Sequence, residues 1–72
     1  MSEFNPQSLI KLKYTAMPYG KYQGSTLIDL PEPYVVWIYE NRLPKGELGD
    51  LISELYEIKV NGLEDLVKSL DI

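Results

Sequence analysis

A short glycine-rich segment holds the residues of this sequence that are best suited to binding a ligand: Tyr19, Gly20, Lys21, Tyr22, Gln23 and Gly24. Glycines let backbone N–H groups come close to a ligand, and concave runs of such groups attract anions. The lysine adds a point charge suited to phosphate, and the tyrosines are suited to stacking on a base or a sugar. The segment therefore predicts a site for nucleic acid or for a phosphorylated ligand. Its spacing is not that of a Walker loop, so a simple turn with packed tyrosines stays an alternative.

Groups suited to catalysis or to metal binding are scarce elsewhere in the chain. The sequence has no histidine and no cysteine, which removes the commonest general base, the commonest metal ligand and any thiolate. Acidic side chains at helical spacing occur at Asp50, Glu54 and Glu57. Such pairs are typical of a solvated helix face, because a divalent cation needs more oxygen ligands than they supply. We therefore expect no catalytic residue, no metal, no cofactor and no enzyme activity.

An almost wholly apolar run extends from Tyr34 to Tyr39. Pro33 favours the first position of a helix, and apolar side chains on nearly every side predict the most buried helix of the fold. Tyr34 and Trp37 are large enough to line a groove. On such a helix, however, we expect Trp37 to lie in the core.

The remaining pattern predicts further helices and one hairpin. Apolar stripes indicate helices over about residues 6–13, 44–60 and 63–70, the first with a cap at Asn5. Gly62 is suited to the left-handed position that ends the second of these helices, and Asn61 and Glu64 are suited to a cap and back-cap of the last. Residues that favour strands indicate a short hairpin over residues 14–25 that turns at Gly20. Thr26 to Asp29 fits a capping box, and we prefer one helical turn over Leu27 to Leu30, with continuation of the second strand through Ile28 as the alternative. We therefore expect an α+β fold in which a short β-hairpin packs against about four helices.

Length and charge limit the organisation of the chain. Its 72 residues are enough for one domain, with residues 1–5 as a flexible terminus. The sequence shows neither a secretion signal nor an apolar run long enough to span a membrane, so we expect a cytoplasmic protein. The net charge of −4 is concentrated in the second half, which favours a basic protein partner. The stripe from Leu48 to Ile58 is a candidate surface for a homodimer.

The glycine-rich segment is part of a longer pattern. Residues 17–24 read Met-Pro-Tyr-Gly-Lys-Tyr-Gln-Gly, Leu30-Pro31 precedes Tyr34 and Trp37, and Leu48-Gly49 and Asn61-Gly62-Leu63 follow. This pattern resembles a family of short bacterial proteins, the putative quorum-sensing-regulated virulence factor family, over about Pro6 to Leu70. The family is a domain of unknown function. The resemblance implies a link to regulation and no particular activity.

The shorter pattern Met-Pro-(Phe/Tyr)-Gly-Lys-x-x-Gly is similar to a segment appended to some bacterial exonucleases of the DnaQ-like type. That resemblance implies a nucleic-acid-associated module without catalysis, because the metal-binding acids of the exonuclease lie in a different domain. Tyr19 replaces a frequent Phe, and Gln23 stands where Lys or Arg is common, which removes one cation. Two functions stay open: a non-catalytic binding module for nucleic acid or a phosphorylated ligand, and a protein-interaction or regulatory domain.

Overall fold

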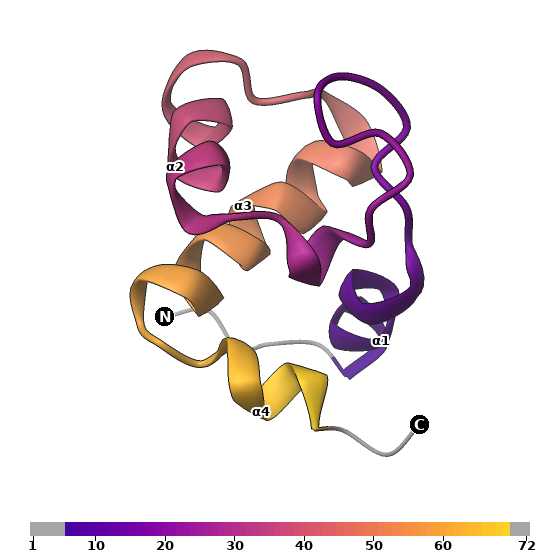
Figure 1. Ribbon diagram of the computed structural model, residues 1–72, viewed down its shortest axis with the longest axis vertical. Coiled ribbons are helices and arrows are strands. Elements are labelled where there is room, and N and C mark those ends of the chain that lie inside the picture. Colours follow the sequence, from indigo (N-terminus) through magenta and orange to yellow (C-terminus); the bar gives the residue numbers. More distant parts are fainter. Residues whose placement is uncertain (1–5, 70–72) are drawn as a thin grey trace.

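The computed structural model describes residues 6–69, which form four α-helices and one 3₁₀ turn (Figure 1). The helical elements are α1 (Pro6–Tyr14), the 3₁₀ turn η1 (Leu27–Asp29), α2 (Glu32–Asn41), α3 (Gly46–Val60) and α4 (Glu64–Lys68). Pro6 occupies the first position of α1, as expected, because the N–H that proline lacks is not needed there. The expected cap at Asn5 and the terminal segment 1–5 lie outside the described residues. None of the helices within residues 6–69 has the length and apolar character needed to cross a bilayer.

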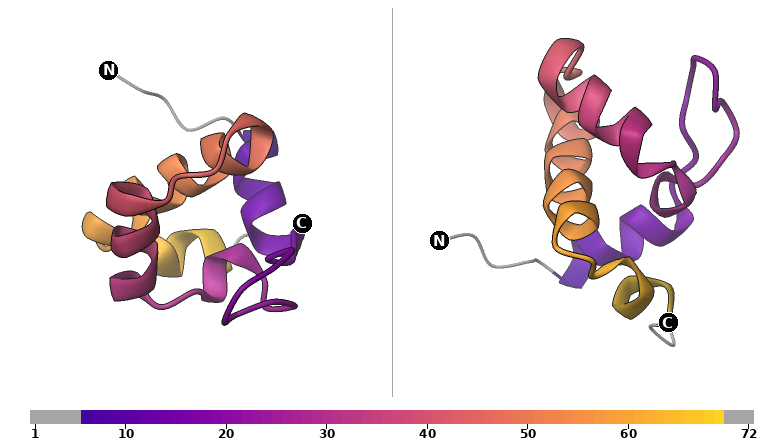
Figure 2. Two further views of the ribbon diagram at one scale, coloured as in Figure 1. Left: turned by 90° about the horizontal axis from the view of Figure 1, so that it is seen from above. Right: turned by 60° about the vertical axis from the view of Figure 1, so that its left-hand side comes forward.

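The predicted α+β class is wrong, because the described residues form a mostly helical fold without a hairpin. The two segments expected to pair as strands meet at one isolated antiparallel bridge, between Ala16 and Thr26. Pro18 has no N–H to donate to a ladder. Gly20 and Gly24 turn the backbone with φ angles of 87° and 92°. The residues between Met17 and Ser25 therefore form an irregular loop, and this loop extends away from the helices (Figure 2).

The preferred helical turn after this loop is confirmed. Leu27–Asp29 forms a 3₁₀ turn instead of continuing a strand, and its two apolar residues are buried. The expected capping box does not form, since the Thr26 hydroxyl donates to the Asp29 carboxylate at 2.7 Å and no side chain caps the turn. This hydrogen bond, together with the nearby charge of Lys68, lowers the pKa of Asp29 against the opposing effect of burial.

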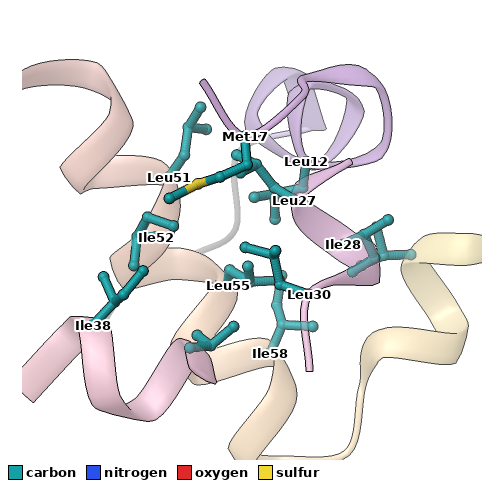
Figure 3. Packing of buried hydrophobic residues seen from close by; sticks show 12 residues of the cluster. Leu12, Met17, Leu27, Ile28, Leu30, Ile38, Leu51, Ile52, Leu55 and Ile58 are labelled. Atoms are coloured by element: carbon teal, nitrogen blue, oxygen red, sulfur yellow. The ribbon is translucent and has the colours of Figure 1, made fainter. Parts of the chain in front are cut away.

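The apolar core lies between α3 and the other helical elements, which each contribute buried side chains to it (Figure 3). Helix α2 packs mainly against α3, while α1 contacts η1, α3 and α4. The stripe on α3 supplies the centre of the core through four buried side chains: Leu51, Ile52, Leu55 and Ile58. Because these side chains are used inside the protein, the Leu48–Ile58 stripe does not provide the homodimer surface that the sequence suggested.

Gly49 lets the first turn of α3 pack closely against the segment between α2 and α3. The helix was expected to start at Pro44 but begins at Gly46. A Cβ atom on Gly49 would lie 1.9 Å from the carbonyl oxygen of Pro44. Only a residue without a side chain therefore lets the connection fold back over the first turn of the helix.

A second glycine ends α3, as predicted. Gly62 has a φ angle of 69°, and its N–H donates to the carbonyl of Lys59 at 3.1 Å. The N–H of Leu63 donates to the carbonyl of Ile58 at 2.8 Å. These two bonds make a Schellman motif, which satisfies the last carbonyls of the helix and turns the chain towards α4.

Lys59 joins three elements from inside the fold. This residue is 6% exposed, and its Nζ donates to the carbonyl of Ile28 at 3.1 Å and to the Glu64 carboxylate at 2.5 Å. A buried ammonium group is tolerated when it is paired and hydrogen-bonded in this way. The hydrogen bond from Lys59 lowers the pKa of Glu64, against an opposing effect of burial. Glu64 is thus engaged with α3 and does not back-cap Asn61, whose side chain donates to the carbonyl of Glu57 at 2.7 Å.

Helix α4 follows its predicted stripe only in part. Val67 is buried, Leu63 is half-buried, and Leu66 is 65% exposed. Leu70, the last residue of that stripe, lies outside the described residues. The short helix is therefore held by the buried side chain of Val67, by the Lys59 ion pair at its start and by an exposed pair between Lys68 and Asp29.

Candidate binding face of the glycine loop and helix α2

The loop over residues 18–24, called the glycine loop below, is closed at its base by backbone hydrogen bonds. The N–H of Met17 donates to the carbonyl of Ser25 at 2.8 Å, and the N–H of Gly24 donates to the carbonyl of Met17 at 2.9 Å. Met17 itself is buried in the core. The loop therefore leaves the fold from a fixed base, although no sheet supports it.

Tyr34 on α2 supports the inner side of the glycine loop. The ring of Tyr22 meets the ring of Tyr34 edge-on, with centroids 4.6 Å apart and planes at 64°. A Cβ atom on Gly20 would lie 3.2 Å from the Tyr34 hydroxyl, so a glycine allows the loop backbone to approach the helix. Tyr22 is half-buried against the core. The Tyr22 side chain is therefore better placed to hold the loop in position than to contact a ligand.

A depression of about 320 Å³ opens between the glycine loop and α2. Its lining consists of Tyr19, Gly20, Tyr34, Trp37, Ile38 and Arg42. The side chains of Tyr19 and Trp37 are 50% and 51% exposed. Two half-exposed aromatic rings at one opening offer flat apolar surfaces on which a base or another ring can stack.

The expectation that Trp37 lies in the core is wrong. Helix α2 faces α3 with Val35 and Ile38, which are its buried residues. Trp37 lies on the neighbouring side of the helix and remains half in solvent. The sequence could not predict this arrangement, because α2 has apolar residues on almost every side and such a run does not indicate which side meets the core.

Positive charge at this face is not neutralised within the described part of the chain. Elsewhere in the fold, lysines pair with carboxylates: Lys11 with Glu47, Lys59 with Glu64 and Lys68 with Asp29. The exposed guanidinium of Arg42 has no such partner within residues 6–69. The amine of Lys21 lies 5.6 Å from the centroid of the Tyr22 ring and has no carboxylate partner there either. Both cations are therefore available to an anion.

Backbone donors add to this charge. The N–H groups of Gly20, Lys21 and Tyr22 make no hydrogen bond within residues 6–69. Those of Gln23 and Gly24 are used inside the loop, the first by the carbonyl of Gly20 at 3.2 Å. Within the predicted segment, the N–H groups that are open to an anion are thus those of residues 19–22. Consecutive open N–H groups beside a lysine are the chemistry that binds phosphate.

The predicted site residues separate into two groups. Tyr19 and Gly20 line the depression, and Lys21 is exposed beside them. Tyr22 is placed for packing, and Gln23 and Gly24 are exposed but do not line the depression.

Tyr34 and Trp37, which the sequence suggested as able to line a groove, both line this depression, whereas Ile38 and Arg42 were not expected there. Arg42 follows the apolar run of α2 and lines the depression with Tyr34 and Ile38. These three residues are spaced at i, i+4 and i+8, which places them in one row along a helix. That spacing was the available signal.

The lining of the depression contains no carboxylate, thiol or imidazole. Asp29 and Glu64, whose pKa values are lowered, do not line it. Within residues 6–69, no three acidic side chains come together in a way that could hold a metal ion. What the arrangement offers is binding, through aromatic surface, positive charge and open N–H groups.

Comparisons with known proteins point to a single family. Residues 5–70 match the family described as "Putative quorum-sensing-regulated virulence factor". Two relatives, each called "Uncharacterized protein YpeB", come from Escherichia coli strain K12 and from Escherichia coli O157:H7. Each is 45% identical over 65 residues, which covers 89% of this chain and 90% of the relative. No solved structure matches the chain. The resemblance seen in the sequence is thereby confirmed, and the chain belongs to the putative quorum-sensing-regulated virulence factor family.

Proposed function

We propose that the chain is a small non-catalytic module that binds single-stranded nucleic acid at the depression between the glycine loop and α2. One observation carries this proposal. The half-exposed rings of Tyr19 and Trp37 border the same depression as the guanidinium of Arg42, which has no carboxylate partner within residues 6–69. Stacking surface next to uncompensated positive charge is the combination by which proteins bind single strands without reading their sequence.

The expected energies are modest and separable. Stacking of a base on an aromatic side chain contributes about 1–3 kcal/mol, so Trp37→Ala should weaken binding by about 5- to 150-fold. Each phosphate contact to a single strand changes the slope of log K against log salt by about −0.7. Contacts from Lys21 and Arg42 would together give a slope of about −1.4. The net charge of −4 opposes binding at a distance, so low ionic strength has competing effects and the variants are more informative than the absolute affinity.

The test is a fluorescence-anisotropy titration of a labelled oligothymidylate of about ten nucleotides, a length within the site sizes of single-strand binders. We expect saturable binding that Lys21→Ala and Arg42→Ala each weaken several-fold. Lys68→Ala is the matched control, because it removes the same charge from α4, where that lysine makes an exposed ion pair with Asp29. Exposed pairs of this kind contribute little to stability. An affinity that falls equally in all three variants would show that only net charge matters, and the proposal would be withdrawn.

A role in protein interaction is the second candidate function. It is favoured by the acidic second half of the chain and by exposed apolar side chains such as Leu43 and Leu66, which are 43% and 65% exposed. The description of the family, which refers to a virulence factor regulated by quorum sensing, is compatible with either function. Absence of oligonucleotide binding at low salt, together with capture of a basic peptide, would favour this candidate.

A further inference from the structure

A second depression, of about 500 Å³, lies on the other side of Trp37. Its lining consists of Glu32, Pro33, Val36, Trp37 and Glu40. The side chains in the middle are apolar, and the two carboxylates are exposed. Trp37 therefore separates two surfaces of opposite character, since the depression at the glycine loop holds an arginine and no acid.

Helix geometry explains the separation. Glu32, Val36 and Glu40 are spaced at i, i+4 and i+8 along α2, so they form one row along the helix. The rise of 1.5 Å per residue puts the two glutamates about 12 Å apart along the axis, with the valine between them. The row that contains Ile38 and Arg42 runs parallel to it on the far side of Trp37.

Neither glutamate is neutralised by the described part of the chain. No lysine or arginine within residues 6–69 pairs with Glu32 or Glu40, whereas Glu47 and Glu64 both have lysine partners. Glu32 lies in the first turn of α2, where a carboxylate favours the positive end of the helix dipole. Glu40 lies near the C-terminal end, where a negative charge is unfavourable for the helix itself. Glu40 therefore adds no favourable dipole interaction to the helix, and its charge stays available to a cation from outside the chain.

We propose that this acidic row docks a basic segment of a partner protein, in which one apolar side chain lies between two Lys or Arg residues. The apolar side chain would fill the depression over Val36, and each cation would meet one glutamate. In an extended chain, residues four apart are separated by about 13 Å, which matches the spacing of the glutamates. The exposed Trp37 ring adds a surface on which a cation can rest.

Other occupants fit less well. Nucleic acid would place phosphates against two unpaired carboxylates, which repel them. A second copy of this chain brings a net charge of −4 to the same surface, so like charges oppose its approach. A basic partner is the occupant whose charge complements the row. This inference does not depend on binding of nucleic acid, because Glu32 and Glu40 lie on the opposite side of Trp37 from Arg42, and Trp37 is the residue that the two depressions share.

The test uses a 16-residue peptide that repeats Arg-Ser-Leu-Ser, titrated into the ¹⁵N-labelled full chain and followed by NMR, with about four repeats to raise the effective concentration of a weak site. We expect saturable shifts of the Val36 amide and the Trp37 indole N–H. The double variant Glu32→Gln/Glu40→Gln should weaken binding at least tenfold, and a peptide with Ser in place of Leu should bind more weakly. Asp65→Asn is the matched control, because Asp65 is also an exposed acid in the first turn of a helix.

Three results would overturn the proposal. The first is an unchanged affinity in the double variant while its thermal midpoint and amide spectrum show an intact fold. The second is a set of shifts that saturates only at other helices. The third is the absence of saturable shifts at millimolar peptide. Arg42→Ala separates this inference from the proposed function, since it should weaken oligonucleotide binding and leave peptide binding unchanged.

Discussion

Substitution of alanine for either of two loop glycines tests how α2 supports the glycine loop. Gly20 and Gly24 have nearly equal left-handed φ angles, 87° and 92°. An L-residue in that conformation costs about 1–2 kcal/mol, of which about 0.4–1 kcal/mol is offset because alanine also restricts the unfolded chain. Gly20→Ala and Gly24→Ala should therefore each lose about 1 kcal/mol of stability. A domain of this size, stable by about 4–10 kcal/mol, would remain folded.

The two positions differ in what a side chain would meet. A Cβ atom at Gly20 lies 3.2 Å from the Tyr34 hydroxyl, whereas none of the surrounding atoms comes within 4 Å of a Cβ at Gly24. Only Gly20→Ala should therefore push the loop away from α2 and disturb the depression. The Tyr34 side chain can yield by a few tenths of an ångström, so the extra loss of stability should stay below about 1 kcal/mol.

The assay compares urea denaturation and oligonucleotide titration on the two variants. We expect a denaturation midpoint for Gly20→Ala at or somewhat below that of Gly24→Ala, an affinity about fivefold or more below wild type for Gly20→Ala, and an affinity close to wild type for Gly24→Ala. A change of 1.4 kcal/mol in binding corresponds to tenfold in affinity, so this difference is measurable. Equal affinities in the two variants, or a larger loss of binding in Gly24→Ala, would refute the reasoning.

Three further predictions concern the fold. Gly49→Ala should destabilise by about 1–3 kcal/mol in urea denaturation, because its Cβ would meet the Pro44 carbonyl oxygen at 1.9 Å; a gain in stability from the better helix propensity of alanine would contradict the observed approach. Lys59→Met should destabilise the protein and speed hydrogen exchange of α4, because it removes the amine that joins Glu64 to the fold; unchanged exchange of α4 would show that the ion pair does not hold it. The free energy of unfolding should fall from about pH 5 downwards, because the pKa values of Asp29 and Glu64 are lower in the folded than in the unfolded chain. The contribution of each carboxylate to stability is therefore present above its unfolded pKa and is lost as the carboxylate is protonated in the folded chain. The slope of stability against pH in acid should be shallower in Lys59→Met, and an identical slope would exclude Glu64 as a source of it.

The helices could be predicted from the sequence because their signals are local. Pro6 marked the start of α1, and the spacing of Leu51, Leu55 and Ile58 marked the face of α3 that meets the core. Gly62 marked the end of that helix through its left-handed conformation. Each signal depends on residues within one or two turns of each other.

The hairpin and the position of Trp37 could not be predicted in the same way, because both depend on contacts between distant segments. Strand-favouring residues around Ala16 and Thr26 suggested a ladder, but Pro18 and the two loop glycines allow only one bridge. The buried Lys59 was also invisible in the sequence, since its partner Ile28 lies 31 residues away. The candidate site was half predicted for this reason: the glycine loop is a local motif, whereas α2 contributes through tertiary packing.

The most direct test of the binding face is the NMR signal of the Trp37 indole N–H, because the chain contains a single tryptophan. On titration with oligothymidylate at low salt, this signal and the amides of Gly20 and Lys21 should shift together and saturate at one affinity, and Arg42→Ala should weaken that affinity. Shifts confined to other surfaces, with the indole signal unmoved at saturating oligonucleotide, would contradict the proposed binding face.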